Sequence, residues 1–115
     1  MKTHKLIIAL SFAFFLLAPL SGVAKGDKVK EKFKVWGNCG MCNKVITKAA
    51  MSVEGVISAK WSSETQKMIV KFYSDQTNLD EIQKKIASVG YDTETYKADD
   101  EVYEKLHYCC KYDRN

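Results

Sequence analysis

The sequence predicts a small α+β sandwich in which two helices cover one face of a four-stranded antiparallel sheet. Three observations support this prediction. Segments with apolar side chains at every second position alternate with segments whose apolar side chains recur every three or four positions. Gly55 and Gly90 stand where the two helical patterns stop. The 115 residues are enough for one compact domain and too few for two.

The first strand is predicted over residues 28–35, where lysines alternate with Val29, Glu31, Phe33 and Val35. Such alternation gives one largely apolar face and one lysine face. The lysine row has two interpretations, a solvated sheet face and a docking surface for an acidic partner, and we favour the first.

A helix is predicted from about Cys42, with an apolar stripe that ends at Val53, and Gly55 stops it. A second strand then covers residues 57–61, residues 62–65 form a hairpin turn, and a third strand covers residues 67–73.

The second helix is expected to open with a capping box formed by Thr77 and Asp80, and Gly90 is expected to cap its C-terminus. Residues 91–96 are predicted as a fourth short strand. The resulting order, βαββαβ, is that of a ferredoxin-like fold. A C-terminal extension over residues 98–115 has three acidic residues at positions 99–101 that are typical of a helix start, so a third, short helix is expected there.

The N-terminus has the features of a cleavable secretory signal. A basic start precedes an apolar segment over residues 6–17, which would span only about 18 Å as a helix, against about 30 Å for a bilayer core. The small residues at 22–24 predict cleavage after Ala24. We therefore expect an exported protein, with the periplasm as its compartment and no membrane anchor after cleavage.

Charge and length exclude several function classes. Without residues 1–24 the chain has 16 basic and 14 acidic residues, and Arg114 is its only arginine, so neither nucleic acid nor an anionic membrane is indicated. No phosphate-binding loop and no convincing acid–base or nucleophile set is present. An enzyme is therefore not expected.

The four cysteines indicate a soft-metal or redox site. Cys39 and Cys42 form a CxxC pair between the first strand and first helix, and Cys109 and Cys110 are adjacent in the extension. Adjacent cysteines rarely bridge each other because the geometry is strained. Cysteines at a helix N-terminus are stabilised as thiolates, and thiolates select Cu(I), Zn(II) or heavier thiophilic ions.

Three short motifs resemble the heavy-metal-associated (HMA) domain family, which includes copper chaperones, copper P-type ATPase domains and mercury-scavenging periplasmic proteins. They are Cys39-Gly-Met-Cys42, Val53-Glu-Gly-Val56 and Val89-Gly-Tyr-Asp92. The resemblance covers residues 29–97 and implies an HMA-like domain over 25–97. It also implies that Cys39 and Cys42 bind one ion and that Tyr91 lies beside it.

The resemblance implies Cu(I) as the cargo, with Hg(II), Zn(II) or Cd(II) as alternatives, and a membrane metal transporter or P-type ATPase as a partner. The sequence departs from the family motif at one position, where Gly37 stands in place of the usual Met. Met41 between the cysteines is either a loop residue or a thioether ligand.

His107, Cys109 and Cys110 lie outside the family pattern. They either complete the metal shell or hold a second ion, or the two cysteines pack on the sheet or form disulfides within or between chains.

Three functions are therefore compared. The first is a soft-metal carrier that transfers or sequesters its ion. The second is a thiol–disulfide redox protein, although the only proline of the chain, Pro19, lies in the predicted signal, and thioredoxin-like proteins need a cis-proline. The third is an interaction module stabilised by disulfides. The carrier is the function we expect.

Overall fold

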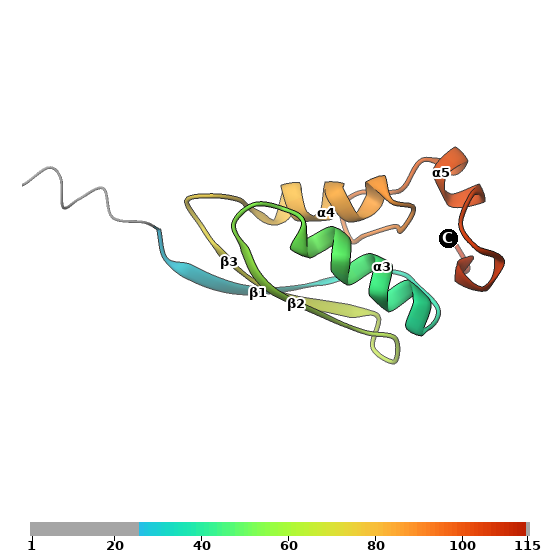
Figure 1. Cartoon of the computed structure of the whole chain (residues 1–115), viewed down its shortest axis with the longest axis horizontal. Helices are drawn as coiled ribbons and strands as arrows, with labels where there is room; N and C mark the ends of the chain where they lie inside the picture. Colours follow the sequence, from blue (N-terminus) through green and yellow to red (C-terminus); the bar gives the residue numbers. More distant parts are fainter. Residues whose placement is uncertain (1–25, 115) are drawn as a thin grey trace, which may run out of the picture.

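The computed structural model describes residues 26–114 (Figure 1). The elements in chain order are β1 (Lys28–Lys34), α3 (Gly40–Met51), β2 (Val56–Ser62), β3 (Lys67–Tyr73), α4 (Leu79–Ser88), α5 (Asp100–Glu104) and the 3₁₀ turn η1 (Tyr108–Cys110). The predicted signal segment lies outside the described residues. Within the described range, no helix has the length and apolar character needed to cross a bilayer.

The sheet is antiparallel, with β3 in the centre between β1 and β2. Met68 of β3 pairs with Phe33 of β1 on one side and with Trp61 of β2 on the other. All three side chains are buried, because they point to the face that α3 and α4 cover (Figure 1). The α+β class and the two-helix layer are confirmed.

The fourth strand predicted over residues 91–96 is not present as a strand. One isolated bridge joins Thr93 to Val35, just beyond β1, and the described sheet has three strands. The reason lies in the backbone of this segment. The Thr93 N–H donates to the Tyr96 carbonyl at 2.7 Å, and the Thr95 N–H donates to the Gln83 side chain at 2.8 Å. Groups that a sheet ladder would need are therefore used within a turn and by α4.

The helix ends follow local chemistry, with two corrections. The N-cap of α4 is Asn78, whose side chain accepts a hydrogen bond from the Glu81 N–H at 2.9 Å, and not Thr77, which is buried. Asparagine is at least as good an N-cap as threonine, so the cap shifts by one residue. Gly90 directly follows the C-cap of α4 and has φ of 109°, the left-handed region that glycine adopts without strain. Gly55 also has a positive φ, of 104°, but α3 already ends at Met51 with Ser52 as its C-cap, so Gly55 lies in the turn after the helix and does not cap it.

The helix-covered face of the sheet forms the core, whose residues come from every strand, from α3 and α4, and from the C-terminal extension. Its largest fully buried side chains include Phe33, Ile46, Met68, Ile82 and Tyr91. Cys42 and Cys110 also lie in this core, at the end where α3 begins. The extension is thus packed onto the domain, and the short helix expected in it is α5.

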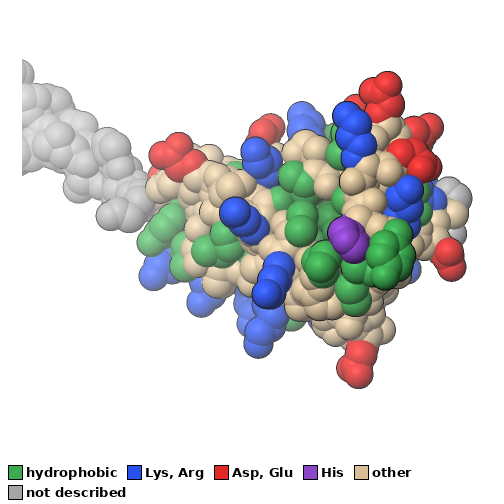
Figure 2. Space-filling view, turned by 45° about the vertical axis from the view of Figure 1, so that its right-hand side comes forward, with side chains coloured by type: hydrophobic (Ala, Val, Ile, Leu, Met, Phe, Trp, Pro, Cys, Tyr) green, Lys and Arg blue, Asp and Glu red, His purple; other side chains and the backbone are tan. Residues whose placement is uncertain are grey.

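The other face of the sheet is uncovered and basic. Lys30 of β1 pairs with Lys71 of β3, and Lys34 pairs with Lys67, so like charges stand directly opposite each other. Figure 2 shows basic side chains, coloured blue, along the lower left edge of the molecule. This face is the solvated lysine face that the alternation predicts.

Candidate metal site

The connection from β1 to α3 presents the CxxC pair at a helix N-terminus. Cys39 is the N-cap residue of α3, with extended backbone angles, and Cys42 lies in the first turn. Among residues 26–114 no side chain caps this helix, and its first turn holds no acidic residue. A thiolate is favoured at such a position because the N-terminal N–H groups carry partial positive charge. Cys39 is half-buried and Cys42 is fully buried.

Gln66 fixes the loop before the pair. Its side-chain amide accepts a hydrogen bond from the Gly37 N–H at 3.0 Å and donates to the Gly37 carbonyl at 3.1 Å. Gln66 reaches this loop from the β2–β3 hairpin, where it has a positive φ of 61°. The loop is therefore held by two bonds from a distant turn.

The structure explains why glycine stands at position 37. A Cβ atom there would lie 3.0 Å from the Trp61 ring and 3.0 Å from Ile46. Trp61 is itself buried and donates its indole N–H to the Val35 carbonyl at 3.0 Å. The space beneath the loop is thus filled by an indole from β2, and the departure at Gly37 leaves no unfilled core.

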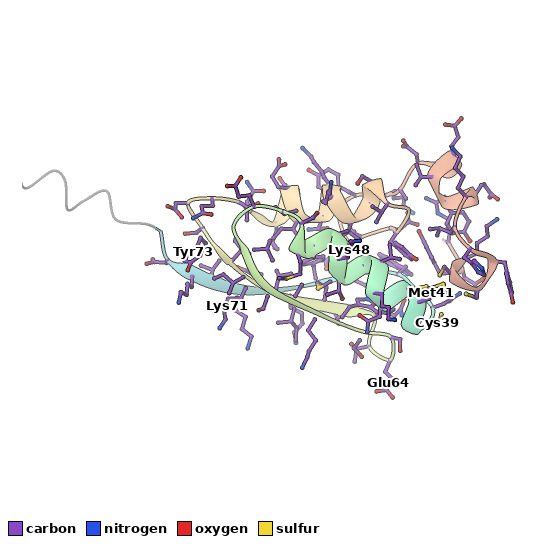
Figure 3. The ribbon with its side chains drawn as sticks, in the orientation of Figure 1. Cys39, Met41, Lys48, Glu64, Lys71 and Tyr73 are labelled. Atoms are coloured by element: carbon purple, nitrogen blue, oxygen red, sulfur yellow. The ribbon has the colours of Figure 1, made fainter. Side chains whose placement is uncertain are left out.

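The C-terminal extension brings a third sulfur to the pair. The Sγ atoms of Cys39, Cys42 and Cys110 all lie within 4.8 Å of one another, and Cys110 is only 2% exposed. All four cysteines are free thiols. Figure 3 shows the sulfurs gathered between the start of α3, where Cys39 and Met41 are labelled, and the tail. Of the accessory residues that the sequence suggests, Cys110 is the one in this cluster.

Cys109 and His107 lie at the rim of the site. The Cys109 sulfur lies 3.9 Å from the Met41 sulfur and 3.5 Å from the His107 Nδ1. Met41 is 47% exposed. In Figure 2 hydrophobic side chains surround the histidine at this end of the molecule. The sequence suggests these residues as accessory ligands. It does not show which cysteine of the adjacent pair turns inward.

Tyr91 lies against the cluster from the loop after α4. Its ring is fully buried and stacks on Tyr112 at 5.7 Å between centroids. Its hydroxyl forms no hydrogen bond among the described residues, although the Cys42 and Cys110 sulfurs lie nearby. Burial, and then these two sulfurs, raise the pKa of Tyr91, so the group remains an O–H donor. A buried hydroxyl without a partner can donate a hydrogen bond to a neighbouring sulfur once that sulfur is a thiolate, as it would be when it binds a metal ion.

The inner thiols have unequal acidity. Burial opposes ionisation of Cys42, but backbone hydrogen bonds from Cys39 and Asn38, with smaller contributions from Tyr91 and Cys110, outweigh it and lower the pKa of Cys42. Burial, and then the neighbouring Cys42, raise the pKa of Cys110 to about 12. Of these two thiols, Cys42 is therefore the one that ionises first, and Cys110 is a thiol beside it.

The anchors of the extension could not be read from local sequence patterns. Asn38 donates from Nδ2 to the carbonyls of Cys109 and Lys111, at 3.2 and 3.0 Å. The Tyr112 hydroxyl donates to the Gly90 carbonyl and accepts from the Asp92 N–H, both at 2.8 Å. Arg114, the only arginine in the chain, was the one sequence feature that could have pointed to an anchor of the extension.

Comparison with known proteins finds a matching family model and relatives that are named for copper export. The family model of the heavy-metal-associated domain matches residues 38–92. A copper-exporting P-type ATPase of Staphylococcus epidermidis is 33% identical over 57 residues, which are 50% of this chain. The chain spans only 7% of the length of that ATPase.

Two solved structures are similar to this chain over most of their own length. The apo copper chaperone of Enterococcus hirae is 31% identical, with a TM-score of 0.52 over 55% of this chain and 94% of its own. Oxidized MerP from Ralstonia metallidurans is 28% identical, with a TM-score of 0.57 over 59% of this chain and 96% of its own. The CxxC loop, the fold and these similarities agree, and the chain belongs to the heavy-metal-associated domain family.

Proposed function

We propose that the protein is an exported carrier of Cu(I) that binds the ion through Cys39 and Cys42 and then transfers or sequesters it. The observation that carries this proposal is the pair of thiols at the N-terminus of α3, with sulfurs within 4.8 Å of each other, in an HMA domain. Thiolate pairs of this kind suit soft ions. The names of the relatives, a copper-exporting ATPase and copper chaperones, favour copper.

The chemistry is ligand exchange and involves no covalent step on a substrate. A thiolate of a partner forms a bond to the ion, one bond to this chain's cysteines breaks, and the ion keeps its oxidation state. The lowered pKa of Cys42 makes this thiol easier to ionise than an ordinary cysteine, and Cys39, which is only half-buried, is the more accessible sulfur of the pair. The protein would then act as a carrier and not as an enzyme.

The proposed partner is a membrane metal transporter, a copper P-type ATPase being the example that the relatives favour. The periplasm is proposed from the signal-like N-terminus. Fractionation of cells that produce the tagged full chain tests this: we expect the shortened protein in the periplasmic fraction, and full-length protein in the cytoplasm would refute export.

Metal binding is tested by anaerobic titration of the reduced protein with Cu(I) in the presence of a chromophoric chelator that competes for the ion. The wild-type protein and a Cys109→Ser control are expected to take one Cu(I) from the chelator. A Cys39→Ser/Cys42→Ser variant should lose this ability while it keeps its far-UV circular dichroism. If the double variant competes as well as the wild type, the proposed site is wrong. Parallel titrations with Hg(II), Zn(II) and Cd(II) rank the alternative ions.

A further inference from the structure

We propose that Cys110 is a third metal ligand, supplied by the tail (residues 105–114), so that the ion is held by three thiolates and is retained until the tail moves. The proposal rests on the proposed function and adds a site residue from outside the HMA region. The geometry that carries it is the approach of the Cys110 sulfur to within 4.8 Å of both Cys39 and Cys42.

The spacing of the sulfurs fits a three-coordinate ion. With metal–sulfur bonds of about 2.3 Å, three sulfurs in a trigonal plane lie about 4.0 Å from one another. The three Sγ atoms already lie within 4.8 Å, so a shift of less than about 1 Å at each sulfur reaches this arrangement. Three convergent thiols without a disulfide form a nearly assembled soft-ion site.

The tail is anchored in a way that fixes Cys110 and not its neighbour. The Asn38 amide, directly before the CxxC motif, holds the carbonyls on either side of Cys110. The Tyr112 hydroxyl donates one hydrogen bond to the loop that carries Tyr91 and accepts another from it. Arg114 closes the tail with two hydrogen bonds to the buried Asp92 carboxylate. These contacts point one sulfur of the adjacent pair inward and leave Cys109 at the rim.

Apolar packing alone does not explain this arrangement. The Cys110 side chain is buried among two thiols and the unpartnered Tyr91 hydroxyl, and a buried polar group without a partner costs free energy. An ion bound by three thiolates would turn the same group into a hydrogen-bond donor to an anionic sulfur. Binding of the ion would therefore give the Tyr91 hydroxyl the hydrogen-bond partner that it lacks in the metal-free protein.

Closure changes how the ion leaves. With Cys110 bound, the tail occupies one of the three ligand positions at the ion, and a partner thiolate that approaches beside the half-buried Cys39 has to displace it. Release then requires the Cys110–metal bond to break as the partner sulfur–metal bond forms, after which the Cys110 thiolate takes up a proton. The tail thus favours retention, and its displacement by a partner would permit transfer.

X-ray absorption at the copper edge tests the proposal on Cu(I)-loaded protein that sedimentation shows to be monomeric. The wild type and the matched Cys109→Ser control are expected to show three sulfur neighbours at one distance, and Cys110→Ser is expected to show two. Two sulfur neighbours in the wild type itself would overturn the proposal, whatever the variants do.

Chelator competition and transfer give a second readout. Cys110→Ser should bind Cu(I) about 10-fold more weakly or worse, and deliver it faster to a small dithiol, than Cys109→Ser. Equal affinity and equal delivery rate in the two variants would contradict the role of Cys110. That result would leave the carrier function intact, whereas normal binding by Cys39→Ser/Cys42→Ser would refute the carrier function itself.

Discussion

The Arg114 guanidinium meets the Asp92 carboxylate through two hydrogen bonds, Nε to Oδ2 at 3.0 Å and Nη2 to Oδ1 at 2.8 Å. The pair joins the end of the chain to the loop after α4, and the Asp92 side chain is only 5% exposed. Arg114 also donates to the Ala98 carbonyl at 2.7 Å and lies over the Tyr103 ring at 4.6 Å. One side chain therefore fixes the tail relative to Tyr91.

Arg114→Gln is expected to weaken tail docking by about 1–3 kcal/mol, because charge-assisted hydrogen bonds to a buried carboxylate are lost. Alkylation of Cys110 in the metal-free protein, followed by peptide mass spectrometry, should become faster. Lys111→Gln is the control, since Lys111 pairs with the exposed Glu104 and such pairs contribute little. Equal protection of Cys110 in both variants would show that Arg114 does not hold the tail.

Acid is expected to release the tail through Asp92. Burial opposes the Asp92 carboxylate, but Arg114, the Ala98 N–H and Lys97 outweigh it and lower the pKa of Asp92. A depressed folded-state pKa adds stability that is complete above the unfolded value of about 3.9 and is lost as the pH falls through the folded value. Tyrosine near-UV circular dichroism should therefore be constant from pH 7 to about 5 and change at more acidic pH. Asp92→Asn should lack this component, and an unaltered acid transition in that variant would assign it to other carboxylates.

Gly37→Ala is expected to lower the free energy of unfolding by about 1–3 kcal/mol through overpacking against Trp61 and Ile46. The chain offers a matched control at Gly40, where a Cβ meets nothing within 4 Å. Gly40→Ala should be neutral or stabilising by about 0.4–1 kcal/mol, because it reduces the freedom of the unfolded chain. Urea denaturation followed by tryptophan fluorescence measures both. A Gly37→Ala variant as stable as the wild type would show that the indole can move aside.

Tyr91→Phe is expected to act in opposite directions on folding and on metal binding. Removal of a buried hydroxyl without a partner should raise the stability of the metal-free protein by up to about 1 kcal/mol. The same change should weaken Cu(I) binding, because the donor to an anionic sulfur is lost. Thermal unfolding and chelator competition measure the two effects. A loss of stability in the metal-free variant would mean that the hydroxyl already has a partner.

The basic sheet face predicts a dependence on salt. Lys30 and Lys71 oppose each other across β1 and β3, as do Lys34 and Lys67, and directly opposed like charges destabilise a sheet. Lys71→Thr is expected to raise the free energy of unfolding by a few tenths of a kcal/mol, and added salt should raise the melting temperature of the wild type more than that of the variant. Lys48→Gln, on α3, serves as the control. An equal salt response in all three proteins would mean that these charges are already screened.

Sequence patterns alone located the strands and helices that build the domain. The alternation around Met68 and the helical stripe through Ile82 and Ile86 each reflect one element with one buried face, so their period is visible without any partner. The same reasoning placed Cys39 and Cys42 between a strand and a helix, where thiolates are stabilised. The resemblance to the HMA family added Tyr91 to the site.

The sequence could not settle features that depend on competition between partners. Residues 91–96 have a strand-like pattern, but the Thr93 N–H bonds to Tyr96 within a turn, so a single bridge remains. Asn78 and Thr77 are both suitable caps, and the burial of Thr77 decides between them. Neither outcome follows from the local pattern, because both depend on what lies nearby in space.

The sequence by itself determined the class of fold and the soft-metal pair, because both depend on short-range periodicity and on residues three positions apart. Only the tertiary structure decided that Cys110 turns inward and Cys109 does not. That choice is made by Asn38, more than 70 residues away along the chain, and by the anchoring of Tyr112 and Arg114 on the loop after α4. Contacts at such separation leave no periodic trace in the sequence, since they arise only when the folded sheet and helices bring the segments together.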